Sequence, residues 1–154
     1  MFGSPVTAET WSIAPIERDR VVLTLRGDFE EAHAAALETA LRERLATAPS
    51  GAIEVVVDIG DLTRCTVEAR DALLRVQRYL GGVARRTAYV ANRPLFRGIG
   101  LWICHHAPDA HARTFPNFAT AEVWLAEKVR RDEDLAQKAA RWLARLRGIR
   151  EVSA

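Results

Sequence analysis

The chain has 154 residues, of which 49% are apolar and 27% are charged, and its formal net charge is +2. This length suits one domain with a short addition, and the apolar content supports a hydrophobic core and excludes general disorder. No apolar run approaches the roughly 18 residues of a membrane span. No basic run is interleaved with aromatic residues, which argues against nucleic-acid binding. The chain starts without signal-peptide features and has two isolated cysteines, so we expect a cytoplasmic protein.

Charge is divided unevenly along the chain. Residues 1–63 carry 5 basic and 11 acidic side chains, residues 64–127 carry 9 and 5, and residues 128–154 carry 8 and 4. The N-terminal part is therefore acidic and the remainder is basic. A division of this kind suits docking against another protein better than following a uniformly anionic polymer.

Two strands are predicted near the N-terminus. Residues 21–27, VVLTLRG, alternate apolar and polar side chains and stop at a glycine, which is typical of a strand. The preceding residues 10–19 alternate in part, but Pro15 restricts them to a sheet edge. Asp19 and Arg20 are expected to turn the chain between these two strands, which then form a hairpin.

Helices and strands alternate over the rest of the chain. Strands are predicted over 53–59, 87–91 and 111–115. The first predicted helix covers 30–46 and buries Ala34, Leu37, Leu41 and Leu45. The second runs from Thr66 to Gly81 and buries Ala69, Leu73, Val76 and Leu80. The third begins at Pro94 and carries Leu95, Ile99, Trp102 and Ile103 on one face, and the fourth covers 119–129. This order predicts an α/β fold with a mixed, mostly parallel sheet and helices packed against it.

The stretch from Asp58 to Leu74 leaves a strand and enters a helix, and such turns often hold the reactive residue of an α/β domain. The predicted turn offers Thr63, Cys65 and Thr66 and has no histidine nearby. Thr66 is expected to be the N-cap of the helix, because a hydroxyl at this position accepts a hydrogen bond from the first turn.

A further amphipathic helix is predicted at the C-terminus. From Asp134 to Arg147, four large apolar side chains share one face of the helix: Leu135, Trp142, Leu143 and Leu146. Basic residues lie beside this face. An isolated helix of this length is marginal in water, so this face should be covered. Three alternatives remain open, in decreasing order of preference: its own domain, a homodimer or partner interface, and a membrane surface.

The order of these elements resembles the STAS domain, the family of bacterial anti-sigma-factor antagonists and sulfate-transporter regulatory tails. The stretches VVLTLRGDFEEAHAAALETALRERLA and IEVVVDIGDLTRCTVEARDALLRV follow the family pattern without gaps. The closing stretch from Arg86 to Glu127 is more similar to the SpoIIAA-like branch of the family. The resemblance covers residues 9–127 and implies a STAS-like domain over 9–130 with an added C-terminal helix over 131–154.

The resemblance implies a degenerate phosphorylation site. In the family, a turn bearing Asp-Ser-Ser-Gly carries the phosphoacceptor serine, and Val67 falls at the position of that serine. Valine has no hydroxyl, so it accepts no phosphate. Thr66 and Thr63 are the alternative acceptors, and Glu68 is an alternative as a permanent anion. We favour Thr66 as a helix cap.

Other chemistry has little support in the sequence. Cys65 next to Arg64 is the one candidate for a reactive thiol, although a small buried residue is the commoner role. The stretch CHHAPDAH contains Cys104, His105, His106 and His111, but adjacent histidines on a helix point about 100° apart and no second cysteine pair completes a zinc site. No phosphate-binding glycine loop, nucleophile elbow or zinc-protease motif is present, so we expect no enzyme, no metal and no cofactor.

The resemblance implies a non-catalytic bacterial regulatory module that works by binding another protein. The implied partner is a kinase-like anti-sigma factor or a larger signalling complex. The implied partner-binding residues are Arg64, Thr66, Glu68 and Arg70. The alternative function is a carrier or sensor of a small apolar, lipid-like ligand, which requires a SpoIIAA-like pocket between the sheet and the helices at Leu95–Trp102 and Trp124.

Overall fold

The computed structural model describes the backbone of residues 3–107, 109 and 111–152, and the side chains of these residues except 128–136 and 149–152. The chain forms two compact units, Met1–Ala121 and Glu122–Ala154. The first unit contains the sheet and the residues of the predicted turn. The domain boundary that the sequence predicts after residue 130 stays a prediction.

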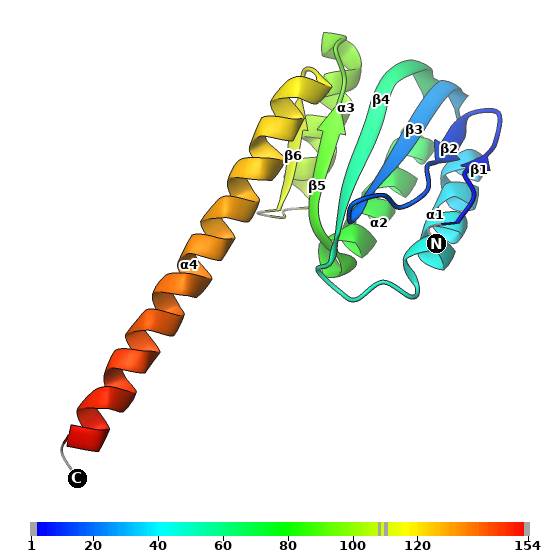
Figure 1. Ribbon diagram of the computed structural model, residues 1–154. Helices are drawn as coiled ribbons and strands as arrows, with labels where there is room; N and C mark the ends of the chain where they lie inside the picture. The colour runs from blue at the N-terminus through cyan, green and yellow to red at the C-terminus, as the bar shows by residue number, and fades with distance from the viewer. Residues whose placement is uncertain (1–2, 108, 110, 153–154) are drawn as a thin grey trace. The chain divides into compact units, whose positions relative to one another are not determined.

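Within the described residues, the chain forms six strands and four helices (Figure 1). The strands are β1 (Val6–Thr7), β2 (Trp11–Ile13), β3 (Arg20–Phe29), β4 (Ile53–Cys65), β5 (Ala84–Val90) and β6 (Ala112–Phe115). The helices are α1 (Glu31–Leu45), α2 (Val67–Val83), α3 (Pro94–His106) and α4 (Phe118–Val152). The predicted alternation of helices and strands is confirmed, and β1 is an additional short strand.

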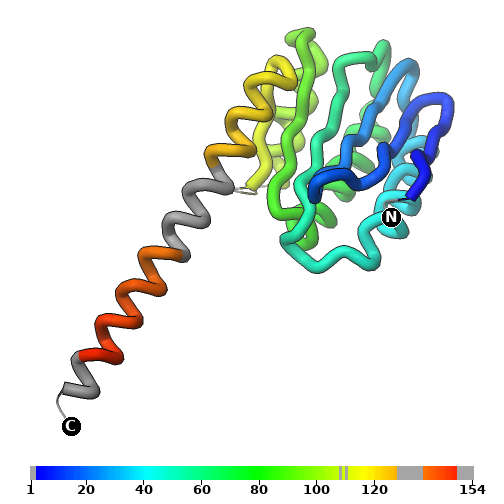
Figure 2. The backbone as a smooth tube through the Cα atoms, viewed as in Figure 1, coloured from blue at the N-terminus to red at the C-terminus, as the bar shows by residue number. Residues whose placement is uncertain are grey.

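The six strands form one sheet in chain order. β1, β2 and β3 pair in antiparallel fashion, whereas β3, β4, β5 and β6 pair in parallel. Right-handed crossovers that step along a sheet in one direction place their helices on one face. The three crossover helices α1, α2 and α3 lie together behind the strands in Figure 2. The predicted mixed, mostly parallel sheet is confirmed.

The hydrophobic core lies between this face of the sheet and the three helices. Side chains of β3 alternate along the strand, and Val21, Leu23 and Leu25 are buried in the core. The residues predicted to be buried on the first two helices are all buried: Ala34, Leu37, Leu41, Leu45, Ala69, Leu73, Val76 and Leu80. Each large aliphatic side chain buried in this way contributes about 1.5–3 kcal/mol to folding.

β4 is longer than the sequence predicts. It continues past Ile59 to Cys65, so the prediction of a turn that begins before Cys65 is wrong. Its parallel pairing with β3 shifts register twice along this stretch. Gly27 of β3 has φ +68°, and Asp58 Oδ1 accepts a hydrogen bond from the N–H of Gly60 at 2.9 Å. The two glycines therefore accommodate irregular pairing inside the strands instead of ending them.

The second and third helices agree with the predictions except at one position. α2 ends at Val83, one residue after the glycines at 81–82, so its predicted end is confirmed to within one residue. Of the four residues predicted on one face of α3, Ile103 is buried and Ile99 and Trp102 pack against the core, whereas Leu95 is 75% exposed. Phe96 is buried in its place.

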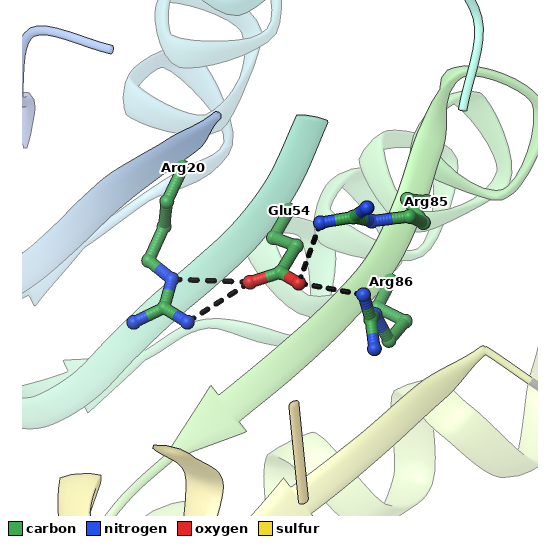
Figure 3. A network of polar contacts seen from close by, with 4 residues as sticks. All are labelled: Arg20, Glu54, Arg85 and Arg86. Atoms are coloured by element: carbon green, nitrogen blue, oxygen red, sulfur yellow. Dashed lines mark hydrogen bonds and ion pairs between the residues drawn. The ribbon is translucent and has the colours of Figure 1, made fainter. Parts of the chain in front are cut away.

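A buried glutamate connects three neighbouring strands. Glu54 of β4 lies between Arg20 of β3 and Arg85 and Arg86 of β5 (Figure 3). Its Oε2 is 2.9 Å from Arg20 Nη2, and its Oε1 is 2.9 Å from Arg85 Nη2 and 2.6 Å from Arg86 Nη2. The Arg86 side chain is fully buried, so Glu54 compensates its charge inside the protein. This network lies at the end of β4 opposite to the start of α2.

α4 is a single continuous helix, whereas the sequence predicts two helices, over 119–129 and 134–147. The charged residues between them contain no proline or glycine, so nothing in the sequence stops the helix there. Among the described residues, no helix has a stretch long and apolar enough to cross a membrane.

Candidate functional site

The first turn of α2 follows directly after β4. Thr66 has φ −67° and ψ 160°, and its Oγ1 accepts a hydrogen bond from the N–H of Ala69 at 3.1 Å. The predicted N-cap is therefore confirmed, and its side chain is half-buried. Glu68 is exposed in the same turn, where the positive end of the helix dipole favours an anion.

Val67 is the first residue of α2, and its side chain is 58% exposed. An aliphatic side chain at this position has no hydroxyl and gains little from folding, because most of it stays in water. Thr63 is exposed near the end of β4. The three positions therefore differ: Thr63 presents a hydroxyl to solvent, Thr66 uses its oxygen to cap the helix, and Val67 has none.

A groove of about 300 Å³ lies beside this turn. One side is formed by the end of β4 and the start of α2, and the other side by the start of α3. The lining residues are Thr63, Arg64, Cys65, Thr66, Val67, Arg70, Leu95, Phe96 and Ile99. The structure thus brings three of the four predicted partner-binding residues together with apolar side chains of α3. The fourth, Glu68, is exposed on the same turn and does not line the groove.

Arg70 differs from the other predicted partner-binding residues. Its side chain is half-buried, and its guanidinium carbon lies 4.0 Å from the ring centroid of Trp102. A cation held over an indole ring in this way is attracted by the ring electrons. Arg70 therefore connects α2 to α3, whereas Arg64 is exposed.

Sequence reasoning missed Arg93, which fixes the start of α3 against the end of β4. Its Nη2 donates a hydrogen bond to the carbonyl oxygen of Gly60 at 2.8 Å and also contacts the carbonyl oxygen of Leu62. Its guanidinium carbon lies 4.3 Å from the ring centroid of Phe96. The available signal was the position of Arg93 just after β5, because the carboxyl ends of parallel strands meet at one edge of a sheet.

The sequence around this site matches a known family. A family model described as "Mlab, STAS domain" matches residues 14–99, which is more than half of the chain. The chain belongs to the STAS domain family. The match extends from the end of β2 into α3, so it includes the groove and the first turn of α2, and it identifies the chain as a regulatory STAS domain.

Two solved structures share the fold of this STAS domain. An uncharacterized protein of the DUF3478 family with a SpoIIAA-like fold, from Shewanella loihica PV-4, has a TM-score of 0.60 and 18% identity over 78% of this chain and 97% of its own. The anti-sigma factor antagonist SpoIIAA in its unphosphorylated form has a TM-score of 0.51 and 14% identity over 79% and 98%. These likenesses show the fold, and they confirm the predicted SpoIIAA-like architecture. A comparison with curated proteins finds no match.

Cys65 lies in the groove of the STAS domain and stays a thiol at neutral pH. Burial raises the pKa of Cys65 to about 11, and the charge of Arg70 opposes this shift only in part. The sequence suggested that Arg64 would help to ionise this cysteine. In the structure the cation that acts on it is Arg70, and the cost of burying a thiolate outweighs it. A protonated thiol is a poor nucleophile.

The sequence also singles out the cysteine and histidines near the end of α3. Burial raises the pKa of Cys104, whose Sγ lies 3.7 Å from Thr114 Oγ1. His105 and His106 are exposed on the last turn of α3. Across the part of the STAS domain that the structure describes, no three His, Cys, Asp or Glu side chains gather to hold a metal ion.

Proposed function

We propose that this STAS domain is a non-catalytic regulatory module that binds another protein through the first turn of α2 and the groove beside it. The docking surface consists of Arg64, Thr66, Val67, Glu68, Arg70 and Leu95. Thr66 and Arg70 hold this surface in shape, through the helix cap and the contact with Trp102. The other members are exposed and contact the partner.

The exposure of Val67 and Leu95 on either side of the groove carries this proposal. The two side chains are 58% and 75% exposed, and both border the same concave surface. Apolar side chains that stay mostly in water gain little from folding, and where they border one concave surface they suit a site at which another molecule removes them from water.

The charges around the groove indicate the chemistry of the partner. Arg64 is exposed at its rim, and Arg93 is exposed close by, at the start of α3. Glu68 is the anion on the same turn. A partner that fits places an apolar side chain in the groove and a carboxylate near Arg64. The family resemblance implies a kinase-like anti-sigma factor or a larger signalling complex as the protein that meets these requirements.

The proposed docking does not depend on phosphorylation. Val67 occupies the family position of the phosphoacceptor and has no hydroxyl, while the Thr66 oxygen caps the helix. We infer that the domain keeps one docking state, in which Glu68 supplies a constant negative charge at the helix start. Its activity is then set by the concentration and affinity of the partner.

The chemistry of the groove supports a non-catalytic role in the cytoplasm. Its one thiol, Cys65, has a pKa raised to about 11 by burial. Both cysteines are free, which fits a reducing compartment.

The carrier alternative finds no support in the packing of α3. It requires space between α3 and the sheet, but Gly100 lies so close that an added Cβ would be 3.0 Å from the Thr114 side chain and 3.2 Å from Tyr89 Cβ. Phe96 and Ile103, on the same face of α3, are buried. We therefore propose no second function.

The test is the affinity of the native partner for variants of the docking surface. Val67→Glu and Arg64→Glu are expected to weaken binding at least tenfold each, because one places a carboxylate beside an apolar contact and the other reverses the charge that attracts the partner. Arg75→Glu is the matched control, since Arg75 is exposed on α2 outside the docking surface. Unchanged melting temperatures show that the variants fold. If both variants bind like the wild-type protein, the docking surface lies elsewhere.

A further inference from the structure

The second unit carries an exposed apolar face on α4. Trp142, Leu143 and Leu146 are 62%, 49% and 40% exposed. The side chain of Leu135, the fourth residue predicted on this face, lies outside the described side chains. Trp142 and Leu146 are four residues apart and so lie one above the other on the helix, and Leu143 is next to them. The family match ends at residue 99 and gives this face no role.

Basic side chains border this face on both sides. Lys138, Arg141 and Arg145 follow one flank at three- and four-residue steps, and Arg147, four residues after Leu143, lies on the other flank. All four are exposed. Residues 137–148 include no acidic side chain, so the surroundings of the apolar face are cationic along this stretch. Its occupant must therefore be anionic as well as apolar.

We propose that this face of α4 binds an anionic lipid surface and lies in the membrane interface parallel to the bilayer plane. Tryptophan and leucine enter the boundary between head groups and acyl chains, and long arginine side chains on both flanks reach the lipid phosphates. The opposite side of the helix in this stretch bears Gln137 and the small residues Ala140, Ala144 and Gly148, so no large apolar side chain of the stretch is left facing water. The sequence alone ranked a membrane last, and the exposure and the flanking charges reverse that order.

The same charges disfavour the two competing occupants. In a homodimer of α4 helices, the basic flanks of both copies would meet along the shared apolar seam and repel each other. A specific protein interface combines apolar contacts with polar groups that fix orientation. From 138 to 148 the helix has only basic, alanine, glycine and large apolar residues. Binding to a lipid surface requires positive charge and apolar area, but no polar groups that fix the orientation of a partner.

Vesicle flotation of the full chain tests this proposal. Vesicles of phosphatidylcholine alone are compared with vesicles that contain about one third phosphatidylglycerol, at low and at moderate salt. The protein is expected to float with the anionic vesicles only, and less as salt increases, because salt screens the attraction. Failure to bind anionic vesicles at low salt would overturn the proposal.

Variants locate the contact. Two double variants are expected to weaken partition into anionic vesicles more than about tenfold: Arg141→Gln with Arg145→Gln, and Trp142→Ser with Leu146→Ser. The first removes two basic residues, each of which changes partition about fivefold near the surface. The second removes the apolar side chains that enter the interface. The control, Arg75→Gln with Arg78→Gln, removes the same charge from exposed positions on α2 and should bind like the wild-type protein. Equal binding by all three variants contradicts the proposal. So does a dimer in light scattering that only Trp142→Ser with Leu146→Ser dissociates, which would identify a second copy as the occupant.

Discussion

Under the proposed function, Val67 is the residue that separates constant docking from a phosphorylation switch. It is exposed at the start of α2 and has no hydroxyl that could accept phosphate. The intact mass of protein purified from its host is expected to show no added phosphate on residues 63–67. A species heavier by one phosphate, mapped to the exposed hydroxyl of Thr63 or to Thr66, would contradict this and restore a phosphorylation switch.

Cys65 allows a direct test of the electrostatics of the groove. Burial raises its pKa to about 11, above the ordinary value of 9.0 for a cysteine thiol, so the folded domain holds the proton until the pH approaches 11. In a Cys104→Ser background, alkylation by iodoacetamide should be slow at pH 7 and should accelerate about tenfold per pH unit up to about pH 11, because the thiolate is the nucleophile. A plateau already reached near pH 8 would show that the surrounding cations outweigh burial.

Single residues at the site were predictable where the cause is local. Thr66 was identified as a cap because capping depends on a hydroxyl and the next three residues. The exposure of Leu95 and the half-burial of Arg70 were not, because both depend on how α3 is rotated against α2. Rotation of α3 about its own axis can bury either Phe96 or Leu95, and the apolar pattern of α3 is compatible with both orientations.

At the scale of elements, the Glu54 network holds β3, β4 and β5 together (Figure 3). Glu54→Gln is expected to lower the free energy of unfolding by about 3 kcal/mol in urea denaturation, because it removes the charge that compensates buried Arg86. The matched control is Glu38→Gln. It removes the partner of Arg42 in an exposed pair on α1, and such a pair contributes about 0.5 kcal/mol or less. Similar losses in both variants would contradict this account of the network.

The ends of elements were the least predictable feature. Gly27 and Gly60 suggest strand ends in the sequence, yet both lie within paired strands, where they permit register shifts. In both cases the pairing partner, which is distant in sequence, outweighs the local preference.

At the scale of the whole molecule, the order of strands and helices was sufficient to predict the fold. Each crossover between parallel strands is right-handed, so an alternation of strands and helices leaves few topologies to consider. The buried stripes of α1 and α2 then fix the face on which the helices pack. The apolar face of α4 was recognised in the sequence, but its exposure needed the structure.

The central claim is that another protein docks on the first turn of α2. Site-specific photo-crosslinking in the native host tests it most directly, with p-benzoylphenylalanine placed at Val67 or, as the control, at Ala36, which is exposed on α1. The proposal predicts one dominant protein adduct from position 67, weakened by Arg64→Glu, and none from position 36. No adduct at position 67, or the same adducts from both positions, would contradict it.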